Sequence, residues 1–185
     1  NLLGERYLDR FSYRGIVLKN DGYISNAVSV TVTEQTQGDY TYHIADVYVQ
    51  NIESIKTAFG GGDYLAGKEL TQQIAIDNGA ILAVNGDGYS SRSSGPLVRN
   101  GVWYRDTVDR ENDVCALLRD GRMLTFAAGK VTVDTLTEQD AFQTWTGGVN
   151  LLDGDGLPLG IYNCPNSVLS RSARTVIGYY EPGHY

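Results

Sequence analysis

Pairs of Asn or Asp followed by Gly, each flanked by short runs of apolar and β-branched residues, constrain the fold of this chain most strongly. Such turns stand at 100–101, 120–121 and 153–156. They favour tight hairpins, because Asn, Asp and Gly tolerate the positive φ of hairpin turns. The chain has 22 glycines and only 4 prolines among its 185 residues, as expected for many turns that join strands. The predicted hairpins cover 97–104, 114–126 and 148–159.

Alternating apolar and polar residues predict a further hairpin, and helical spacing predicts short helices. Residues 27–35 and 40–50 alternate with period two and are rich in β-branched residues, so we expect an antiparallel pair. Helical patterns occur at 52–59, 67–78 and 137–144. Asn51 is a suitable N-cap for the first of these helices, and Gly79 suits the end of the second. With a last β-prone segment at Arg174–Tyr180, the predicted class is α+β, mainly antiparallel strands with two or three packed helices.

Length and composition exclude several classes of protein. A formal net charge of −7 argues against nonspecific nucleic-acid binding, whereas an anionic small substrate stays compatible if a few arginines converge. No apolar run is long enough to span a bilayer, and the chain opens on Asn1 without a signal peptide, as expected of a mature or trimmed product. Cys115 and Cys164 make no disulfide framework, and we expect Cys115 to be a buried thiol. We expect 1–26 to form an N-terminal arm and 27–185 one domain.

The segment Ala80–Gly88, with the sequence AILAVNGDG, joins a short apolar run to a polar, glycine-rich turn. The apolar part is typical of a strand buried on both faces. The turn would then present Asn85 and Asp87 at an open loop, a common way to hold polar chemistry on a rigid scaffold. The alternative is an ordinary strand that ends in a tight turn. Residues 90–96 follow, small and polar, and suit an active-site lid or a plain mobile loop equally.

Two known motifs match the sequence only in part and are rejected. The candidate residues that remain are arginines. Residues 62–68 fit a phosphate-binding loop, but Glu69 stands where Ser or Thr must ligate magnesium. Residues 153–159 begin like a calcium loop and then supply no oxygen side chains. The arginines at turn and strand ends are Arg92, Arg99, Arg105, Arg171 and Arg174. Each alone is typical of a solvated surface charge, but Arg174 opens an apolar segment, where a guanidinium can bind phosphate through two parallel hydrogen bonds.

Several segments, in the same order along the chain, resemble the phosphodiester glycosidase family. They are YHIADVYVQ (42–50), ILAVNGDGY (81–89), LVRNGVWYRD (97–106), GGVNLL (147–152) and SARTVIGYYEPGHY (172–185). The Asn-Gly turn after an apolar run, followed much later by Ala-Arg-Thr-x-Ile-Gly, is the more specific pair of features. The ending resembles exopolysaccharide-associated bacterial members in particular. The resemblance therefore implies a location outside the cell or tethered to the outer face of the membrane.

The resemblance implies hydrolysis of a sugar phosphodiester, which releases a sugar such as N-acetylglucosamine and leaves a phosphomonoester on a glycan or cell-wall polymer. Arg174 would meet the phosphate, and Asp87 would stabilise positive charge at the anomeric carbon. Asn85 would hydrogen-bond sugar or phosphate oxygens. The substrate-binding residues that the resemblance implies are Gly86, Arg99, Asp46, Gly148, Asn150 and Thr175. No cofactor is certain, and a divalent cation stays open.

The sequence departs from the family pattern towards its C-terminal end. The family carries a second signature, Asn-Leu-Asp-Gly-Gly with a following Ser, and this sequence does not contain it. We expect the family domain to be incomplete here: either the chain is a fragment, or a cleaved C-terminal segment of the same protein completes it, or the whole molecule is longer than this chain. A glycosidase uses a pair of carboxylates, so we expect the chain alone to be inactive. The alternatives are a noncatalytic carbohydrate- or cell-wall-binding module that keeps the fold, and a generic α+β domain with similar turns.

Overall fold

The computed structural model describes residues 3–162, 164 and 166–185, and its contacts divide the chain into two compact units. Unit 1 comprises Asn1–Ile55, Asp120–Arg122 and Ile177–Tyr185, and unit 2 comprises Lys56–Arg119 and Met123–Val176. The strands are β1 (Val17–Lys19), β2 (Gly22–Ile24), β3 (Val28–Gln37), β4 (Tyr40–Val49), β5 (Leu97–Arg99), β6 (Val102–Arg105), β7 (Asp113–Leu118), β8 (Met123–Phe126) and β9 (Ala141–Gly148). The helices are α1 (Thr71–Asp77), α2 (Val133–Glu138) and α3 (Asn166–Leu169), with 3-10 turns η1 (Leu3–Arg10), η2 (Ile52–Ser54), η3 (Gly60–Gly62) and η4 (Tyr89–Ser91). The α+β class is confirmed.

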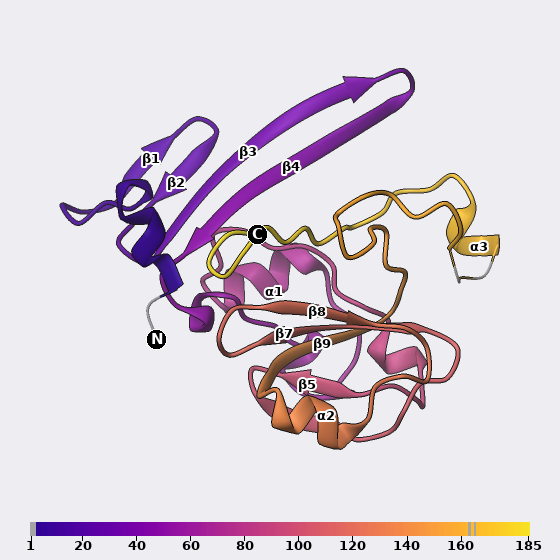
Figure 1. Ribbon diagram of the computed structural model, residues 1–185. Helices are drawn as coiled ribbons and strands as arrows, with labels where there is room; N and C mark the ends of the chain where they lie inside the picture. The colour runs from indigo at the N-terminus through magenta and orange to yellow at the C-terminus, as the bar shows by residue number, and fades with distance from the viewer. Residues whose placement is uncertain (1–2, 163, 165) are drawn as a thin grey trace. The chain divides into compact units, whose positions relative to one another are not determined.

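Unit 1 contains an antiparallel sheet in the order β1-β2-β3-β4, and the predicted hairpin of β3 and β4 is confirmed. Figure 1 shows this hairpin as the longest pair of strands in the chain. Val49 is buried at the base of the hairpin, whereas the half beyond Val32 is exposed. The C-terminal residues bind the free edge of β4, because the backbones of Val47 and Tyr185 exchange two hydrogen bonds of 2.9 Å. β2 and β3 pair across residue 26, and the predicted division of the chain there stays a prediction.

Unit 2 contains the three-stranded sheet β8-β7-β9 and the two-stranded sheet β5-β6. Its core cluster comprises Val114, Ala116, Leu118, Val131, Leu136 and Ala141, with Trp103, Leu124 and Phe126 packed against it. Helix α2 packs against β9 in this unit, and Leu136 of α2 is fully buried. Because β9 is buried along most of its length, it provides a rigid support for the loops that precede β5.

The hairpins predicted from Asn-Gly and Asp-Gly pairs are confirmed. Asn100 and Gly101 join β5 to β6 with φ of 53° and 78°, as a type I′ turn requires. Gly121 has φ of 86° in the turn between β7 and β8. The third turn is held by the Asp153 carboxylate, which accepts hydrogen bonds from two backbone N–H groups 2.9 Å away. Leu152 and Pro158 form its one bridge, so this hairpin is short.

The helix predicted at 137–144 is wrong. Helix α2 ends at Glu138, Asp140 turns the chain with φ of 53°, and Ala141 begins β9. The sequence AFQTWTGG contains two aromatic and two β-branched residues, which favour a strand because they pack well against neighbouring strands. Packing against β7 therefore outweighs the helical spacing of the first residues of this segment.

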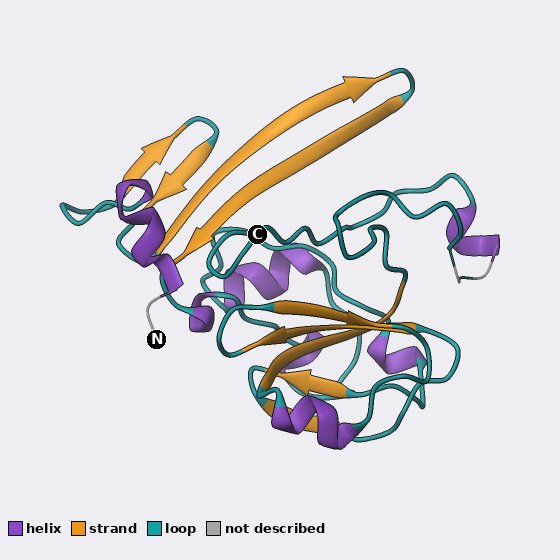
Figure 2. Ribbon diagram, viewed as in Figure 1, coloured by secondary structure: helices purple, strands orange, loops and turns teal. Residues whose placement is uncertain are grey.

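Two β-prone segments predicted as strands are irregular and exposed. Ala80–Val84 forms no strand, and Ile81 and Val84 are half exposed or more. Arg174–Tyr180 is also irregular, and Figure 2 draws it as part of a long stretch of loop. A β-strand needs the hydrogen bonds of a neighbour, and no described strand pairs with either segment. The expectation of a strand buried on both faces at Ala80–Val84 is therefore wrong.

The predicted helices before this segment are shorter in the structure. Asn51 is confirmed as a cap, since its side chain accepts from the Glu53 backbone N–H, but the turn it opens ends at Ser54 and Ile55 is extended. Helix α1 keeps only Thr71–Asp77, and Gly79 follows it with φ of 61°. None of the helices in the described part of the chain combines the length and apolar character that a membrane span needs.

Candidate functional site

The carboxylate of Asp87 is the meeting point of three segments of unit 2. The Arg99 Nη2 donates to Asp87 Oδ1 at 2.5 Å, and the Thr146 backbone N–H donates to Asp87 Oδ2 at 2.9 Å. The side chains of Asp87 and Arg99 are only 8% and 5% exposed. The two residues thus form a buried ion pair whose carboxylate is held on both oxygens.

Local structure explains why Arg99 is available to Asp87. Arg99 is the last residue of β5 before the type I′ turn, and β5 packs beside β9. Its Nη1 donates to the carbonyl of Thr144 in β9 and, at 3.4 Å, to that of Val98. Burial lowers the pKa of Arg99 and the neighbouring Asp87 opposes that change, so the guanidinium stays charged. Arg99 is therefore an anchor for Asp87, and both of its terminal nitrogens are already engaged.

Aromatic side chains flank the ion pair. The Arg99 guanidinium lies 5.9 Å from the centre of the Tyr89 ring, within the range of a cation–π contact. Burial raises the pKa of Tyr89, while Arg99 lowers it and Asp87 raises it again. A side chain at Gly86 would meet the Trp145 indole at 3.9 Å, so Gly86 lies beside that ring. A planar or apolar face of a ligand has aromatic partners here.

Two further arginines lie in the loop and strand next to the pair. Arg105 Nε donates to the Gly95 carbonyl at 2.7 Å, and its Nη1 donates to the carbonyls of Arg92 and Tyr89 at 2.6 and 3.2 Å. The guanidinium of Arg92 lies against Gly147, where a Cβ would come within 2.1 Å of Arg92 Nη2. The expectation that Arg92 and Arg105 are ordinary solvated charges is wrong, because both are partly buried.

Asn85 lies near the ion pair in sequence but is exposed. Its Oδ1 accepts from the hydroxyl of Thr71, the first residue of α1. Gly88 has φ of −82°, and Gly86 is likewise outside the positive-φ region. A Cβ at Gly88 would come within 3.2 Å of the Ser91 hydroxyl oxygen, which is a tight contact, whereas a Cβ at Gly86 would make only an ordinary contact with Trp145.

The other predicted residues of unit 2 lie in the segments after β9. Arg174 is exposed and donates to the backbone carbonyls of Val168, Ser170 and Ala173, and Thr175 follows it in the exposed irregular stretch. Gly148 ends β9 and is exposed. None of the contacts recorded for these described residues is with Asp87 or Arg99.

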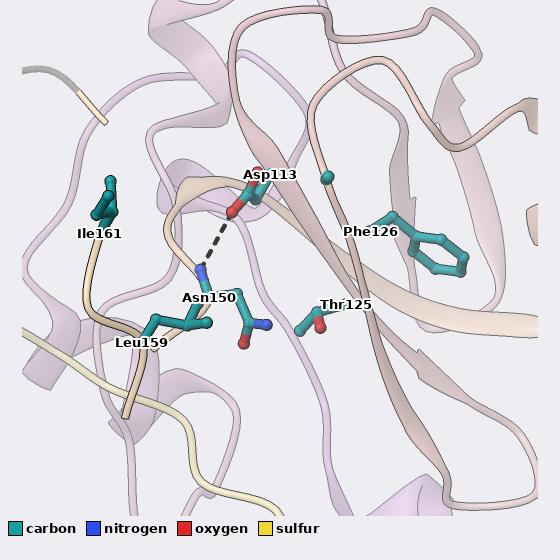
Figure 3. Close-up of a pocket in the computed structure, with 7 residues that line it drawn as sticks. Asp113, Thr125, Phe126, Asn150, Leu159 and Ile161 are labelled. Atoms are coloured by element: carbon teal, nitrogen blue, oxygen red, sulfur yellow. Dashed lines mark hydrogen bonds between the residues drawn. The ribbon is translucent and has the colours of Figure 1, made fainter. Parts of the chain in front are cut away.

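Asn150 lines a cavity of about 220 Å³ in unit 2. Its backbone N–H donates to Asp113 Oδ2 at 3.2 Å, and the other oxygen of Asp113 accepts from the Ala128 N–H. Figure 3 shows Asp113, Asn150 and Thr125 grouped together, with the Phe126 ring directed away from Asn150. Leu159 and Ile161 line the other side of the cavity. Because Ile161 is 89% exposed, the cavity is open to solvent on that side.

Asp46 belongs to unit 1. Its Oδ1 lies 2.6 Å from His184 Nε2, and the imidazole is stacked between the rings of Tyr48 and Tyr180, with centroids 4.2 and 4.3 Å away. The side chain of Asp46 is nearly half exposed. Among the described residues, no group of three or more His, Cys, Asp or Glu side chains is arranged to hold a metal ion.

Sequence reasoning missed Thr146, whose backbone binds Asp87 and whose side chain is 1% exposed. The helical spacing of 137–144 predicts a helix just before it and so gives no reason to place Thr146 on a strand. The signal that identifies it is the alternation in 141–148, which places Phe142, Thr144 and Thr146 on one face of a strand.

Comparisons with known proteins find one distant likeness. No family model matches the chain, and no curated protein matches it. Among solved structures, it is similar to the zebrafish N-acetylglucosamine-1-phosphodiester alpha-N-acetylglucosaminidase, solved as a catalytic domain auto-inhibited by its pro-peptide, with 17% identity and a TM-score of 0.42. The match covers 68% of this chain and 44% of that one, so the chain spans less than half of the matched structure. A likeness of this size does not assign the chain to a family.

Proposed function

We propose that this chain contributes the Asp87 site to the hydrolysis of a sugar phosphodiester, with release of the sugar and formation of a phosphomonoester. The observation that carries the proposal is the convergence on Asp87. Arg99 comes from one segment that resembles phosphodiester glycosidases, Asp87 from another, and Thr146 directly precedes a third. Segments that carry the resemblance thus meet at one buried carboxylate.

The chemistry suits this arrangement. Cleavage of a bond at an anomeric carbon builds positive charge on the sugar, and a nearby carboxylate stabilises it. The Arg99 and Thr146 donors fix the Asp87 carboxylate in one orientation, and pre-organisation of this kind lowers the cost of reaching the transition state. Tyr89 and Trp145 supply rings against which a sugar can lie. Such a reaction also needs a second carboxylate. We assign no residue of this chain to that role, and none to a divalent cation.

A noncatalytic module that binds a sugar phosphate or phosphorylated glycan is the second candidate. The observation that favours it is the engagement of both Asp87 oxygens, because a carboxylate tied to a buried arginine can serve recognition without attacking a substrate. An extracellular or membrane-tethered location at a bacterial surface, with exopolysaccharide or cell-wall polymer as the source of substrate, is part of either proposal.

The test measures binding and sugar release with an N-acetylglucosamine 1-phosphodiester. Protein purified from the producing cells and the 185-residue chain produced by itself are assayed in parallel, and an intact mass shows whether a second segment accompanies the chain. We expect sugar release by the native material, and binding without release by the chain alone. Asp87→Asn should lower release by roughly 10²- to 10⁴-fold, the range for loss of a positioned acid or base.

Two controls make the result interpretable. Asp106→Asn changes an exposed carboxylate that follows β6 and should leave release unchanged. Because removal of one partner of a buried ion pair can unfold a domain, Asp87→Glu keeps the charge and should also abolish release in a folded protein. Binding without release in both preparations would favour the binding module, and an absence of binding in both would overturn both candidates.

A further inference from the structure

Near the Asp87–Arg99 pair, three buried polar atoms make no hydrogen bond with the described residues. Among the described residues, Arg92 Nε, Arg105 Nη2 and the Thr146 hydroxyl are buried atoms without a hydrogen-bond partner. Thr146 is 1% exposed. Buried polar atoms are paired in most proteins, and an unpaired donor on a cation is especially costly. Three such atoms in one small region indicate that something else binds there.

The three atoms belong to side chains linked through two glycines. Arg105 binds the Gly95 carbonyl, and a Cβ at Gly95 would lie 2.9 Å from the Thr146 hydroxyl oxygen. Gly147 follows Thr146 and lies against the Arg92 guanidinium. Gly95 and Gly147 have φ of 93° and 101°, so both positions favour glycine for their backbone and for the close approach of these side chains.

The charge of this region defines the class of ligand. The recorded side-chain hydrogen bonds of Arg105 go to neutral backbone carbonyls, and none is recorded for Arg92, so no carboxylate in the described part of the chain forms an ion pair with either guanidinium. Asp87 is paired with Arg99. Asp109 is the other buried carboxylate nearby, and its oxygens are engaged by Ser94, Asn112 and the Glu111 N–H. Even with both carboxylates counted, three arginines leave an excess of positive charge in a chain of net charge −7.

We propose that Arg92, Arg105 and the Thr146 hydroxyl form a phosphoryl-binding subsite beside Asp87. A phosphoryl group offers several oxygens to guanidinium donors and neutralises the excess charge, which a water molecule cannot do. The subsite replaces Arg174 as the phosphate ligand that the resemblance implies. Arg99 then serves to position Asp87. Arg92 belongs to the loop at 89–96, which the hydrogen bonds of Arg105 and Ser94 hold in place, so entry of the ligand requires this loop to shift.

The identity of the ligand rests on the proposed function, but the subsite can be tested without it. Binding of inorganic phosphate to the 185-residue chain is followed by ³¹P NMR line broadening and by calorimetry. Arg92→Gln removes a guanidinium without a recorded side-chain hydrogen bond, so the fold should persist. Gly147→Ala keeps Arg92 and displaces its guanidinium, but it also strains the backbone at φ of 101°, so circular dichroism must show a native fold before its phosphate affinity is compared. Each should weaken phosphate binding by roughly 10- to 100-fold, as for loss of a charged hydrogen bond.

The matched control is Arg110→Gln, which removes an exposed arginine of unit 2 and should leave the affinity unchanged. Wild-type affinity in Arg92→Gln, an equal loss in Arg110→Gln, or an absence of phosphate binding by the unmodified chain would each overturn the subsite. Phosphate binding that depends on Arg92, in a protein that never releases sugar, would support the subsite and refute the hydrolase. Sugar release that depends on Asp87 but not on Arg92 would support the hydrolase and refute the subsite.

Discussion

Each unit contains a carboxylate paired with a cation from a distant part of the sequence, and the two pairs differ in burial and in chemistry. In unit 2, the side chains of Asp87 and Arg99 are 8% and 5% exposed, and the cation is a guanidinium that keeps its charge at any ordinary pH. In unit 1, Asp46 and His184 are 46% and 15% exposed, and the cation is an imidazole that is charged only when protonated.

The Asp87–Arg99 pair is a fixed, buried site, whereas the Asp46–His184 pair is a contact near the surface. A buried pair contributes little net stability, but each partner depends on the other, because a lone charge in the interior is costly. A solvated pair contributes little and costs little to lose. The surroundings of His184 are also solvated, since the Tyr180 ring that stacks on it is 74% exposed. Candidate chemistry therefore belongs to the Asp87 pair, and the Asp46 pair lies where the C-terminal residues are bound to β4 by backbone hydrogen bonds.

The largest effect is expected for Arg99→Met. This substitution keeps the volume but leaves the Asp87 carboxylate buried without its counter-ion, so the free energy of unfolding should fall by about 3–5 kcal/mol. Urea denaturation measures the loss. Arg110→Met, at an exposed position, should stay within about 0.5 kcal/mol of the unmodified chain. A loss below about 1 kcal/mol for Arg99→Met would mean that the pair is as solvated as that of Asp46 and His184.

Local signals were sufficient where a feature depends on a few neighbouring residues. The Asn100-Gly101 turn, the β3–β4 hairpin and the Asn51 cap were predictable, because turn chemistry, alternation and capping act within a few residues. Asp87 and Arg99 were both named as candidates from sequence. Their direct pairing was not, because it depends on the packing of β5 beside β9.

The failures share one physical cause, which is that packing decides structure where local patterns are ambiguous. The start of β9 has helical spacing, yet contacts with β7 make it a strand and place Thr146 at the site. Ala80–Val84 has a strand pattern, yet it lacks a described neighbour and stays irregular. Arg174 looked like a phosphate ligand only if its segment were a strand, and its recorded partners are nearby backbone carbonyls.

The stability of unit 1 should depend on pH through the contact between Tyr7 and Glu181. Burial and the hydrogen bond to Glu181 raise the pKa of Tyr7 to about 12, from 10.0, and the same bond lowers the pKa of Glu181 from 4.5. The Tyr7 contribution should be complete below pH 10 and vanish between pH 10 and 12. The Glu181 contribution should be complete above pH 4.5 and vanish as the pH falls below it.

Tyr7→Phe tests this dependence. The difference in unfolding midpoint between the unmodified chain and Tyr7→Phe should be largest between pH 5 and 10 and should shrink on either side. Tyr42→Phe, on the exposed half of β4, should show no such profile. A difference that is constant from pH 3 to 12 would show that the Tyr7–Glu181 bond contributes nothing.

The smallest effect is expected for Asp46→Asn. The amide oxygen can still accept a hydrogen bond from His184, and only the charge is lost, so the free energy of unfolding should fall by about 0–1 kcal/mol. Since His184 also stacks on Tyr48 and pairs with β4 through the backbone, the C-terminal residues should stay bound. Protection of the Val47 and Val49 amides in hydrogen exchange measures this directly. Loss of that protection in Asp46→Asn would show that this half-exposed pair, like the buried one, is essential to its unit.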